Sequence, residues 1–273
     1  MKMAKYVTYT VFFCSLFFLA PSAHAFGETN RYLVKSSSSL ARKAVGSIRH
    51  DFGVSFSADL SPFQIRIARM FGDVERVGQL AISEQDAPAM HTPYDAFLTL
   101  DESDVSVAVL DTGYGADDSN GHGTHIADII ASKGNAHLVI YRVCNERGYC
   151  FSDDVAAAIR AAADVNVQII NMSFGSDQHS PLIAGAIKYA VDREVLLVAA
   201  AGNNGPFEDS VEYPARDPLV ISVGALTTDG EPFDWSSRGK VDALEIGEYE
   251  MISGTSVAAA HYSGFLARTW KHD

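Results

Sequence analysis

The chain has 273 residues, 47% of them hydrophobic, so it is long enough to bury a sizeable core and to form more than one folded unit. Its formal net charge is −13, and this acidity argues against a nucleic-acid partner. The charge is uneven, because residues 26–85 contain eight Lys or Arg and six acidic residues, whereas residues 86–273 contain eleven and twenty-eight. Opposite charges steer association, so we expect the two parts to bind each other.

The first 25 residues have the pattern of a secretory signal peptide. Lys2 and Lys5 precede the apolar run VFFCSLFFLA at 11–20, and an A-x-A cleavage site follows at 23–25. The apolar run is short for a permanent membrane-spanning helix, and no later segment reaches about 18 consecutive apolar residues. We therefore expect a secreted or periplasmic protein with no membrane contact after the signal peptide is removed.

Residues 26–85 predict a small α+β unit. Periodicity indicates strands in RYLVKS, VSFSADL and VERVGQLAI, and helices over 38–50 and 62–71. Two strand-helix-strand units of this size are typical of a compact ferredoxin-like module.

Residues 86–273 alternate apolar strands with helical patterns. The sequence predicts strands at 105–110, 137–143, 167–173, 195–201 and 219–226, and helices near 122–132, 152–163, 180–191 and 256–270. The strands are largely apolar on both faces, as parallel strands are, and Ser152-Asp153-Asp154 and Ser180-Pro181 are typical helix starts. We predict an α/β three-layer sandwich with a mostly parallel sheet and a site at the carboxyl ends of its strands.

Two chemical groups follow the first of these strands. The run VAVLDTGYG at 107–115 ends at Asp111 in a Gly-bounded turn, and NGHGTHIADII at 120–130 places His122 where a helix begins. His122 can act as a general base whose tautomer Asp111 fixes. Asp-Thr-Gly also matches the aspartic-protease triplet, but a single-chain enzyme of that kind needs a second one, which is absent from the sequence. His122 and His125 could also ligate a metal; we expect none.

Cys144 and Cys150 are the cysteines that remain after the signal peptide is removed. In an oxidising compartment we expect a disulfide between them that closes the short loop NERGY. Two cysteines alone cannot complete a four-coordinate structural zinc site.

Two later segments add a nucleophile and a donor. The run VLLVAAAGNNG at 195–205 ends a buried strand near Asn203, whose amide can donate to an oxyanion, although turn preference explains such residues too. In SGTSVAAAHYSG, Ser256 has small neighbours that let a carbonyl approach, and the first helical amides can face the developing oxyanion. An ordinary helix N-terminus has the same pattern, but the upstream Asp111 and His122 favour a nucleophile.

These segments together resemble the subtilases, the subtilisin-like serine proteases. The matching motifs, in family order over roughly residues 90–270, are VAVLDTG, HGTH, INMSFG, AAAGNNG, YPA, VISVGAL and SGTSVAAAH. The resemblance implies an endopeptidase for protein or peptide substrates, with Asp111, His122 and Ser256 as the triad and Asn203 and the Ser256 amide as the oxyanion hole. It implies the three-layer fold and no cofactor, leaves a structural calcium ion open, and we expect a monomer.

The N-terminal segments VSFSADLS and GDVERVGQL resemble the propeptide domain that precedes many subtilases. The resemblance implies a signal peptide over 1–25, a propeptide over 26–85 and a shortened catalytic domain over 86–273. Such a propeptide acts as an intramolecular chaperone and inhibitor whose final strand leads into the active site. The alternative is a structural domain that is never removed.

The resemblance also implies a primary specificity pocket. Its walls correspond to the backbone of Ser173, Phe174 and Gly175 and that of Ala200, Ala201 and Gly202. Glu212, just before Tyr-Pro, lies near the floor, and a carboxylate there favours Lys or Arg before the scissile bond. The alternative is that Glu212 points to solvent.

The chain departs from the family pattern in several places. Asp111 and His122 are only eleven positions apart, and the long loop that carries calcium in many relatives is missing. Ala260 replaces a common proline, and Glu245-Ile246-Gly247 stands where Ala-Pro-Gly is usual. These departures leave two alternatives, a catalytically silent subtilase-fold binding module and a peptide ligase or macrocyclase that uses the same acyl-enzyme.

Overall fold

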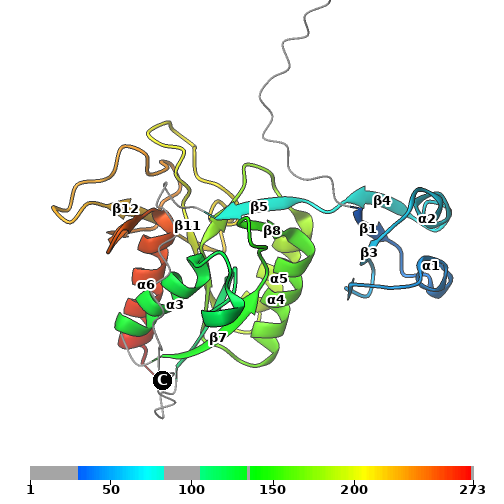
Figure 1. The fold of residues 1–273 in the computed structure, drawn as a ribbon, viewed down its shortest axis with the longest axis horizontal. Helices are drawn as coiled ribbons and strands as arrows, with labels where there is room; N and C mark the ends of the chain where they lie inside the picture. The colour runs from blue at the N-terminus through cyan, green and yellow to red at the C-terminus, as the bar shows by residue number, and fades with distance from the viewer. Residues whose placement is uncertain (1–29, 83–104, 134–135, 272–273) are drawn as a thin grey trace, which may run out of the picture.

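The computed structural model describes residues 30–82, 105–133 and 136–271, which form a small N-terminal unit and a larger body (Figure 1). The predicted signal peptide and the predicted domain boundary at residue 85 lie outside these ranges. Among the described helices, none combines the length and the apolar character that crossing a membrane requires.

The N-terminal unit is a four-stranded antiparallel sheet with two helices. Its elements are β1 (Arg31–Lys35), α1 (Ser39–Val45), β2 (His50–Asp51), β3 (Phe56–Asp59), α2 (Pro62–Ala68) and β4 (Asp73–Arg76). The strand order β2-β3-β1-β4 is that of the predicted ferredoxin-like module. Apolar residues from both helices and from β1 and β3 fill a core of its own, with Val34 and Phe56 fully buried.

Two predicted elements of this unit differ from the structure. The helix predicted over 38–50 ends at Val45, because Gly46 adopts a φ of 81° that terminates it, and β2 follows. The predicted strand VERVGQLAI is two strands, β4 and β5 (Gln79–Ile82), separated at Val77-Gly78. The second of them leaves the N-terminal sheet and pairs with strands of the body.

The body confirms the predicted α/β architecture with a parallel sheet. Its elements are β6 (Ser106–Asp111), η1 (Gly115–Asp117), α3 (His122–Lys133), β7 (His137–Arg142), β8 (Tyr149–Phe151), α4 (Ser152–Asp164), β9 (Ile169–Met172), β10 (Phe174–Gly175), α5 (Pro181–Val191), β11 (Leu196–Ala200), β12 (Ile221–Leu226), β13 (Ala243–Ile246), β14 (Glu248–Tyr249), β15 (Ile252–Ser253) and α6 (Thr255–Thr269). Six strands form a parallel sheet in the order β13-β12-β11-β9-β6-β7.

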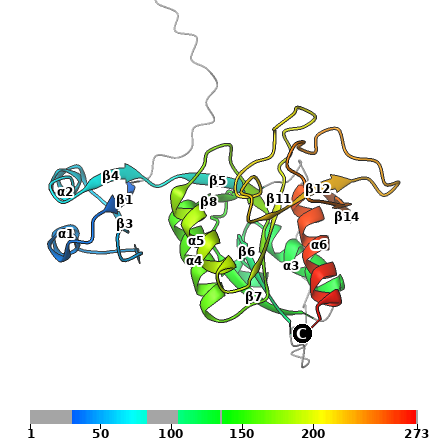
Figure 2. The same cartoon turned by 180° about the vertical axis from the view of Figure 1, so that it is seen from behind.

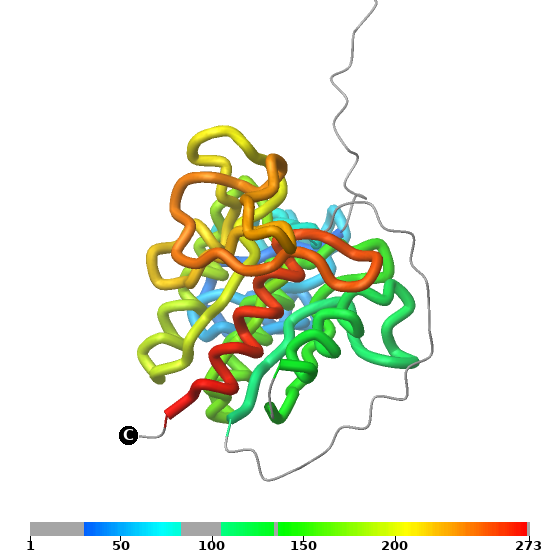
Figure 3. The backbone as a smooth tube through the Cα atoms, turned by 90° about the vertical axis from the view of Figure 1, so that its left-hand side faces the viewer, coloured from blue at the N-terminus to red at the C-terminus, as the bar shows by residue number. Residues whose placement is uncertain are grey.

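Helices cover both faces of this sheet, which makes three layers (Figures 1 and 2). The helices α3 and α6 lie side by side on one face, and α4 and α5 lie on the other (Figure 3 shows the α3–α6 side). Each face buries its own apolar cluster, because parallel strands such as β9 are buried on both sides.

The predicted helices agree closely with the structure, but the cap of α4 and one strand of the parallel sheet differ from the prediction. The Ser180 side chain caps α5 as predicted, with Pro181 as the first helical residue. At α4 the cap position is Phe151, and the Ser152 N–H donates to the carbonyl of Gly78 instead. The sixth strand, β13, was not predicted, because its four half-exposed residues lack an apolar run.

The predicted disulfide is present between Cys144 and Cys150. Both cysteines are buried, and the loop between them turns the chain back from β7 into β8. The bond therefore fixes the position of β8, the strand that β5 pairs with.

Candidate active site

The candidate site lies where the direction of the chain connections changes within the parallel sheet. From β6, the chain continues through α3 to β7 on one side, whereas β9 and the later strands lie on the other side. Such a point opens a crevice at the carboxyl ends of the two central strands. Asp111 is the last residue of β6, so its carboxylate is delivered to this crevice.

Asp111 and His122 form a buried pair. His122 is the first residue of α3, and its Nδ1 lies 2.7 Å from Oδ1 of Asp111. Both residues are almost fully buried, and the Thr112 N–H donates to the same carboxylate oxygen at 2.7 Å. A carboxylate held in this way fixes the ring orientation and the tautomer with hydrogen on Nδ1, which leaves Nε2 as the basic nitrogen.

Asp118, which was not predicted from the sequence, forms hydrogen bonds that hold the short segment between Asp111 and His122. Its carboxylate accepts from the hydroxyl of Thr112 at 2.8 Å and from both the N–H and the hydroxyl of Thr124, at 2.8 and 2.7 Å. Burial alone would raise the pKa of the Asp118 carboxyl, but these bonds outweigh it and lower that pKa. An Asp four residues before the histidine, in a turn that begins a helix, is the signal that could have found it.

Ser256 lies at the start of α6 and is bound to the end of β9. Its Oγ donates to the carbonyl of Ser173 at 3.1 Å, and the Ser173 hydroxyl donates to the carbonyl of Ser256 at 3.2 Å. Asn171 donates to the Ser173 hydroxyl at 3.0 Å and accepts from Ser263 at 2.9 Å. Because β9 is the neighbour of β6, this buried network holds Ser256 at the same crevice as Asp111.

The Asn203 side chain is oriented by Thr255. The N–H and the hydroxyl of Thr255 donate to Oδ1 of Asn203 at 3.1 and 3.0 Å. A backbone N–H can only donate, so the oxygen end of the amide must face Thr255 and the NH2 end must face away. The Thr255 hydroxyl also accepts from the N–H of Gly202 at 3.1 Å, which joins the β11 turn to α6. The residue that precedes Ser256 in the chain therefore fixes the orientation of the Asn203 amide.

The segments predicted as pocket walls converge on Glu212. Ser173 and Phe174–Gly175 follow β9, Ala201 and Gly202 follow β11, and the Glu212 N–H donates to the carbonyl of Ala201 at 2.9 Å. A Cβ built on Gly175 would collide with the Glu212 carboxylate, and one built on Gly202 would lie 2.9 Å from it. The Glu212 side chain therefore lies between the two glycines.

The Glu212 carboxylate is partly removed from water. Asn204 donates to its Oε1 at 2.6 Å. Burial raises the pKa of the Glu212 carboxyl, and the negative charge of Asp177 raises it further, while the Asn204 bond opposes both. A partly desolvated carboxylate binds an opposite charge more strongly than an exposed one.

The strand β5 lies between β8 and β10. It pairs antiparallel with β10 through Ile82–Phe174 and Ala81–Gly175, and antiparallel with β8 through Leu80–Cys150. An extended segment of the chain thus lies directly on β10, the strand that was predicted to form one wall of the pocket. This is the arrangement of a peptide bound by strand addition.

Among the described residues, the group of side chains close enough to share a metal ion is His50, Asp153 and Asp154. These residues belong to the contact between the N-terminal unit and α4. Neither Asp111 nor His122 is part of such a group.

Comparison with known proteins gives one consistent result. Residues 101–273 match the model of the subtilase family. A subtilisin from Bacillus sp. (strain TA39) is 34% identical in an alignment of 211 positions that covers 61% of this chain and 50% of the relative. An intracellular serine protease from Paenibacillus polymyxa is 34% identical in an alignment of 213 positions that covers 60% of this chain and 65% of the relative. The chain therefore spans between half and two thirds of the length of these relatives.

Solved structures agree with the sequence comparison. The S41 psychrophilic protease is 31% identical with a TM-score of 0.55, over 61% of this chain and 76% of that protein. Sphericase is 30% identical with a TM-score of 0.56, over 62% and 77%. The matched part has the size of the body described above.

Proposed function

The chain belongs to the subtilase family, and on this premise we propose that it is a serine endopeptidase with Asp111, His122 and Ser256 as its triad. The observation that carries the proposal is the buried hydrogen bond between Asp111 and His122, in the crevice that also holds Ser256. A buried histidine with a carboxylate on Nδ1 is an oriented base, and a serine at a helix start is its natural partner.

The proposed reaction uses these groups in sequence. The Ser256 hydroxyl gives its proton to Nε2 of His122 and attacks the peptide carbonyl, and the Asp111 carboxylate stabilises the imidazolium. The imidazolium then protonates the leaving amine, and water releases the acyl group by the reverse proton transfers. For attack, the Ser256 hydroxyl must point to His122 and not to the Ser173 carbonyl, to which it donates at 3.1 Å.

Asn203 and the Ser256 N–H would bind the oxyanion. The orientation of the Asn203 amide by Thr255 supports this role, because the NH2 group is held before the reaction begins. A donor fixed in advance stabilises developing charge without reorganising in the transition state.

We also propose that the N-terminal unit is a removable inhibitor. Support comes from β5, which lies on β10 where an extended substrate would add a strand. A strand there blocks substrate until the N-terminal unit is cut from the body and dissociates, and we expect the cut between about residues 80 and 92.

The proposed enzyme is exported, acts on protein or peptide substrates and works as a monomer without a cofactor. The A-x-A site at 23–25 and the Cys144–Cys150 disulfide support export, because disulfides persist in oxidising compartments.

Replacing Ser256 by Ala tests the proposal. We expect the Ser256→Ala precursor to stay uncut and to lose peptide hydrolysis by roughly 10⁴-fold or more, because the covalent step needs that hydroxyl. The measurements are mass spectrometry of the purified chain, hydrolysis of a peptide substrate, and labelling by a fluorophosphonate after the N-terminal unit is cut.

Ser132→Ala is the matched control, since Ser132 is an exposed serine near the end of α3. It should process, hydrolyse and label like the wild type. A folded wild-type chain that takes no label on Ser256 would instead be a silent binding module, and one that labels but joins peptides would be a ligase.

A further inference from the structure

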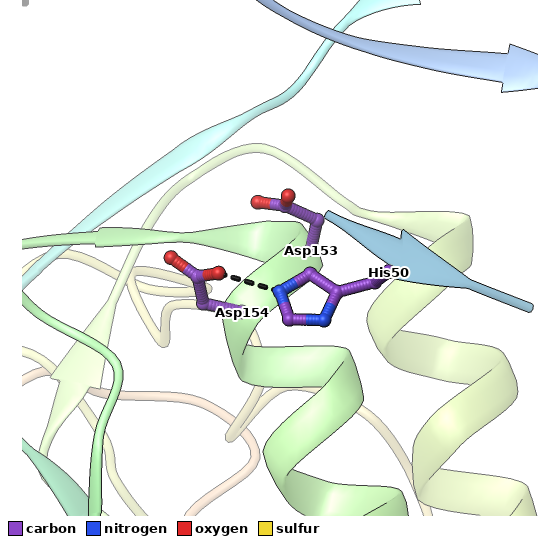
Figure 4. Close-up of side chains that lie close together, drawn as sticks. All are labelled: His50, Asp153 and Asp154. Atoms are coloured by element: carbon purple, nitrogen blue, oxygen red, sulfur yellow. Dashed lines mark hydrogen bonds and ion pairs between the residues drawn. The ribbon is translucent and has the colours of Figure 1, made fainter. Parts of the chain in front are cut away.

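The N-terminal unit contacts the first turn of α4 through a cluster of charges. The Arg31 guanidinium donates to Asp153 Oδ1 at 3.0 Å and to Asp154 Oδ2 at 2.7 Å. His50 Nε2 lies 2.7 Å from Asp154 Oδ1, and Figure 4 shows its ring reaching from β2 to that carboxylate. Arg49 adds longer ion pairs to both acids, at 3.8 and 3.7 Å. Three basic side chains of one unit thus meet two carboxylates of the other.

This cluster is buried at its centre. Asp153 is fully buried and Arg31 is 9% exposed. The Arg31 guanidinium also lies over the ring of Phe151, with 3.9 Å from Cζ to the ring centroid. Burial raises the pKa of the Asp154 carboxyl, but the bonds from His50 and Arg31 outweigh it and lower that pKa. Arg31 and Asp153 form a buried ion pair, and removing either residue would leave the other as an uncompensated buried charge.

The rest of the contact between the two units is loosely packed. A cleft of about 630 Å³ separates them, lined by Leu33, Phe52 and Val54 on one side and His179, Leu182 and Gly185 on the other. At the edge of the cleft, Phe52 packs against the apolar cluster of the body. The polar contacts that hold the N-terminal unit on the body include the pairing of β5 and the charge cluster at α4.

The same acids could be considered as metal ligands, since His50, Asp153 and Asp154 present ligand atoms within 4.8 Å of one another. Arg31 already bridges both carboxylates, so it supplies the positive charge that a cation would bring. A metal ion would have to displace this guanidinium.

We propose that Asp153 and Asp154 form a docking site for an arginine, and that Arg31 of the N-terminal unit is its occupant. We call this contact the Arg31 latch. It holds the N-terminal unit so that Gly78 accepts from the Ser152 N–H and β5 enters the sheet between β8 and β10. The latch extends the proposed function, since it identifies the surface through which the inhibitor is held.

Hydrogen exchange in the full chain tests the latch. The Ser256→Ala background keeps the chain intact, so the measurement needs no activity. We expect Arg31→Gln to accelerate amide exchange in residues 79–82 and 149–156 by at least about tenfold, because releasing the unit opens the β5–β8 pairing. Lys35→Gln is the matched control, since Lys35 is on the same strand but pairs with Glu75 at an exposed site.

Asp154→Asn repeats the test from the side of the body and does not alter the N-terminal unit. Faster exchange in β1 and β3 would reveal that Arg31→Gln disturbs the fold of the N-terminal unit. In that case the Asp154→Asn variant decides whether the latch holds the unit on the body. The charge exchange Arg31→Glu with Asp154→Arg should restore at least part of the protection that Arg31→Glu removes.

Two results would overturn the latch. One is exchange in Arg31→Gln and Asp154→Asn that matches Lys35→Gln. The other is slower exchange in residues 149–156 of the EDTA-treated chain when Zn²⁺ is added, which would make the acids a metal site. If the latch is absent, the proposed peptidase activity is not contradicted. If the chain has no peptidase activity, the exchange measurement still tests the latch.

Discussion

Glu212 places a carboxylate between Gly175 and Gly202, on the two segments that form the expected pocket walls. Glycine at both positions leaves room for this carboxylate, because a Cβ on either one would force the Glu212 side chain to move. A half-buried acid between two backbone walls fits a basic side chain better than an apolar one. The geometry favours the pocket interpretation over the alternative in which Glu212 faces solvent.

Glu212→Gln should therefore weaken any preference for Lys or Arg before the scissile bond. The expected loss in kcat/KM for basic substrates is roughly 10–100-fold, since a hydrogen bond to a charged group contributes about 1.5–3 kcal/mol. Profiling a peptide library with the mature enzyme measures it, and Glu208→Gln is the control because Glu208 is exposed. Identical profiles for wild type and Glu212→Gln would remove Glu212 from substrate recognition.

The residues of the site were predictable to different degrees. Asp111, His122, Asn203 and Ser256 could be proposed from the sequence because each lies in a short segment with its own chemistry. The orientation of Asn203 could not, because it depends on Thr255, which is 52 residues away in the sequence. Asp118 was overlooked because an acid in a Gly-rich turn has an ordinary explanation as a turn residue.

The helices α3 and α6 cross closely at Gly264. A Cβ at this position would lie 2.7 Å from Cβ of Lys133 and 2.9 Å from the carbonyl oxygen of Ile130. The contact needs a residue without a side chain, and it brings the helix that begins with His122 against the helix that contains Ser256. Packing between these two helices therefore supports the placement of the proposed base and the proposed nucleophile.

Gly264→Ala should destabilise the fold, although alanine is the better helix former. The steric cost of about 1–3 kcal/mol exceeds the gain in helix propensity of about 1 kcal/mol, because a backbone carbonyl must move. Gly185→Ala in α5 is the opposite case, since its nearest neighbour is an Arg160 side-chain nitrogen at 3.9 Å. It should stabilise by about 0.5–1 kcal/mol.

Urea unfolding of the two glycine variants and the wild type measures both effects. The prediction for this helix pair is contradicted if Gly264→Ala is as stable as Gly185→Ala. That result would mean that α3 and α6 separate at low cost.

Helices and strands were predicted well where the apolar periodicity of the sequence is strong. They were predicted poorly where the bounds of a strand depend on which strand it pairs with. The helix starting at Pro181 follows from Ser180-Pro181, and β6 follows from its apolar run. The sequence did not predict the division of VERVGQLAI at Gly78, because the two halves together have the pattern of one alternating strand. What separates them is the partner of each half, the N-terminal sheet for β4 and the body for β5.

The stability of the whole molecule should depend on pH through His261. This residue of α6 is 5% exposed, and burial lowers the pKa of its imidazole, with the Lys133 charge lowering it further against the opposing Glu245. The folded state thus prefers neutral His261. Its contribution to stability is complete above the unfolded pKa of about 6.5 and is lost as the pH falls below that value.

His261→Gln should reduce the loss of unfolding free energy between about pH 7 and pH 5, because glutamine takes up no proton. Urea titrations at a series of pH values measure this slope. His137→Gln serves as the control, since His137 is exposed on β7. An unchanged slope in His261→Gln would assign the acid sensitivity to other groups.

The position of β5 has a consequence for the timing of activity. While the chain is whole, the covalent link from β5 to β6 keeps β5 at an effective concentration near β10 that does not fall when the protein is diluted, of order millimolar for a flexible linker. A cut after β5 turns the same contact into a binding equilibrium between two molecules. Dilution would then separate the proposed enzyme from its N-terminal unit. At high concentrations of the two fragments, the unit would stay bound after the cut and the enzyme would stay inhibited.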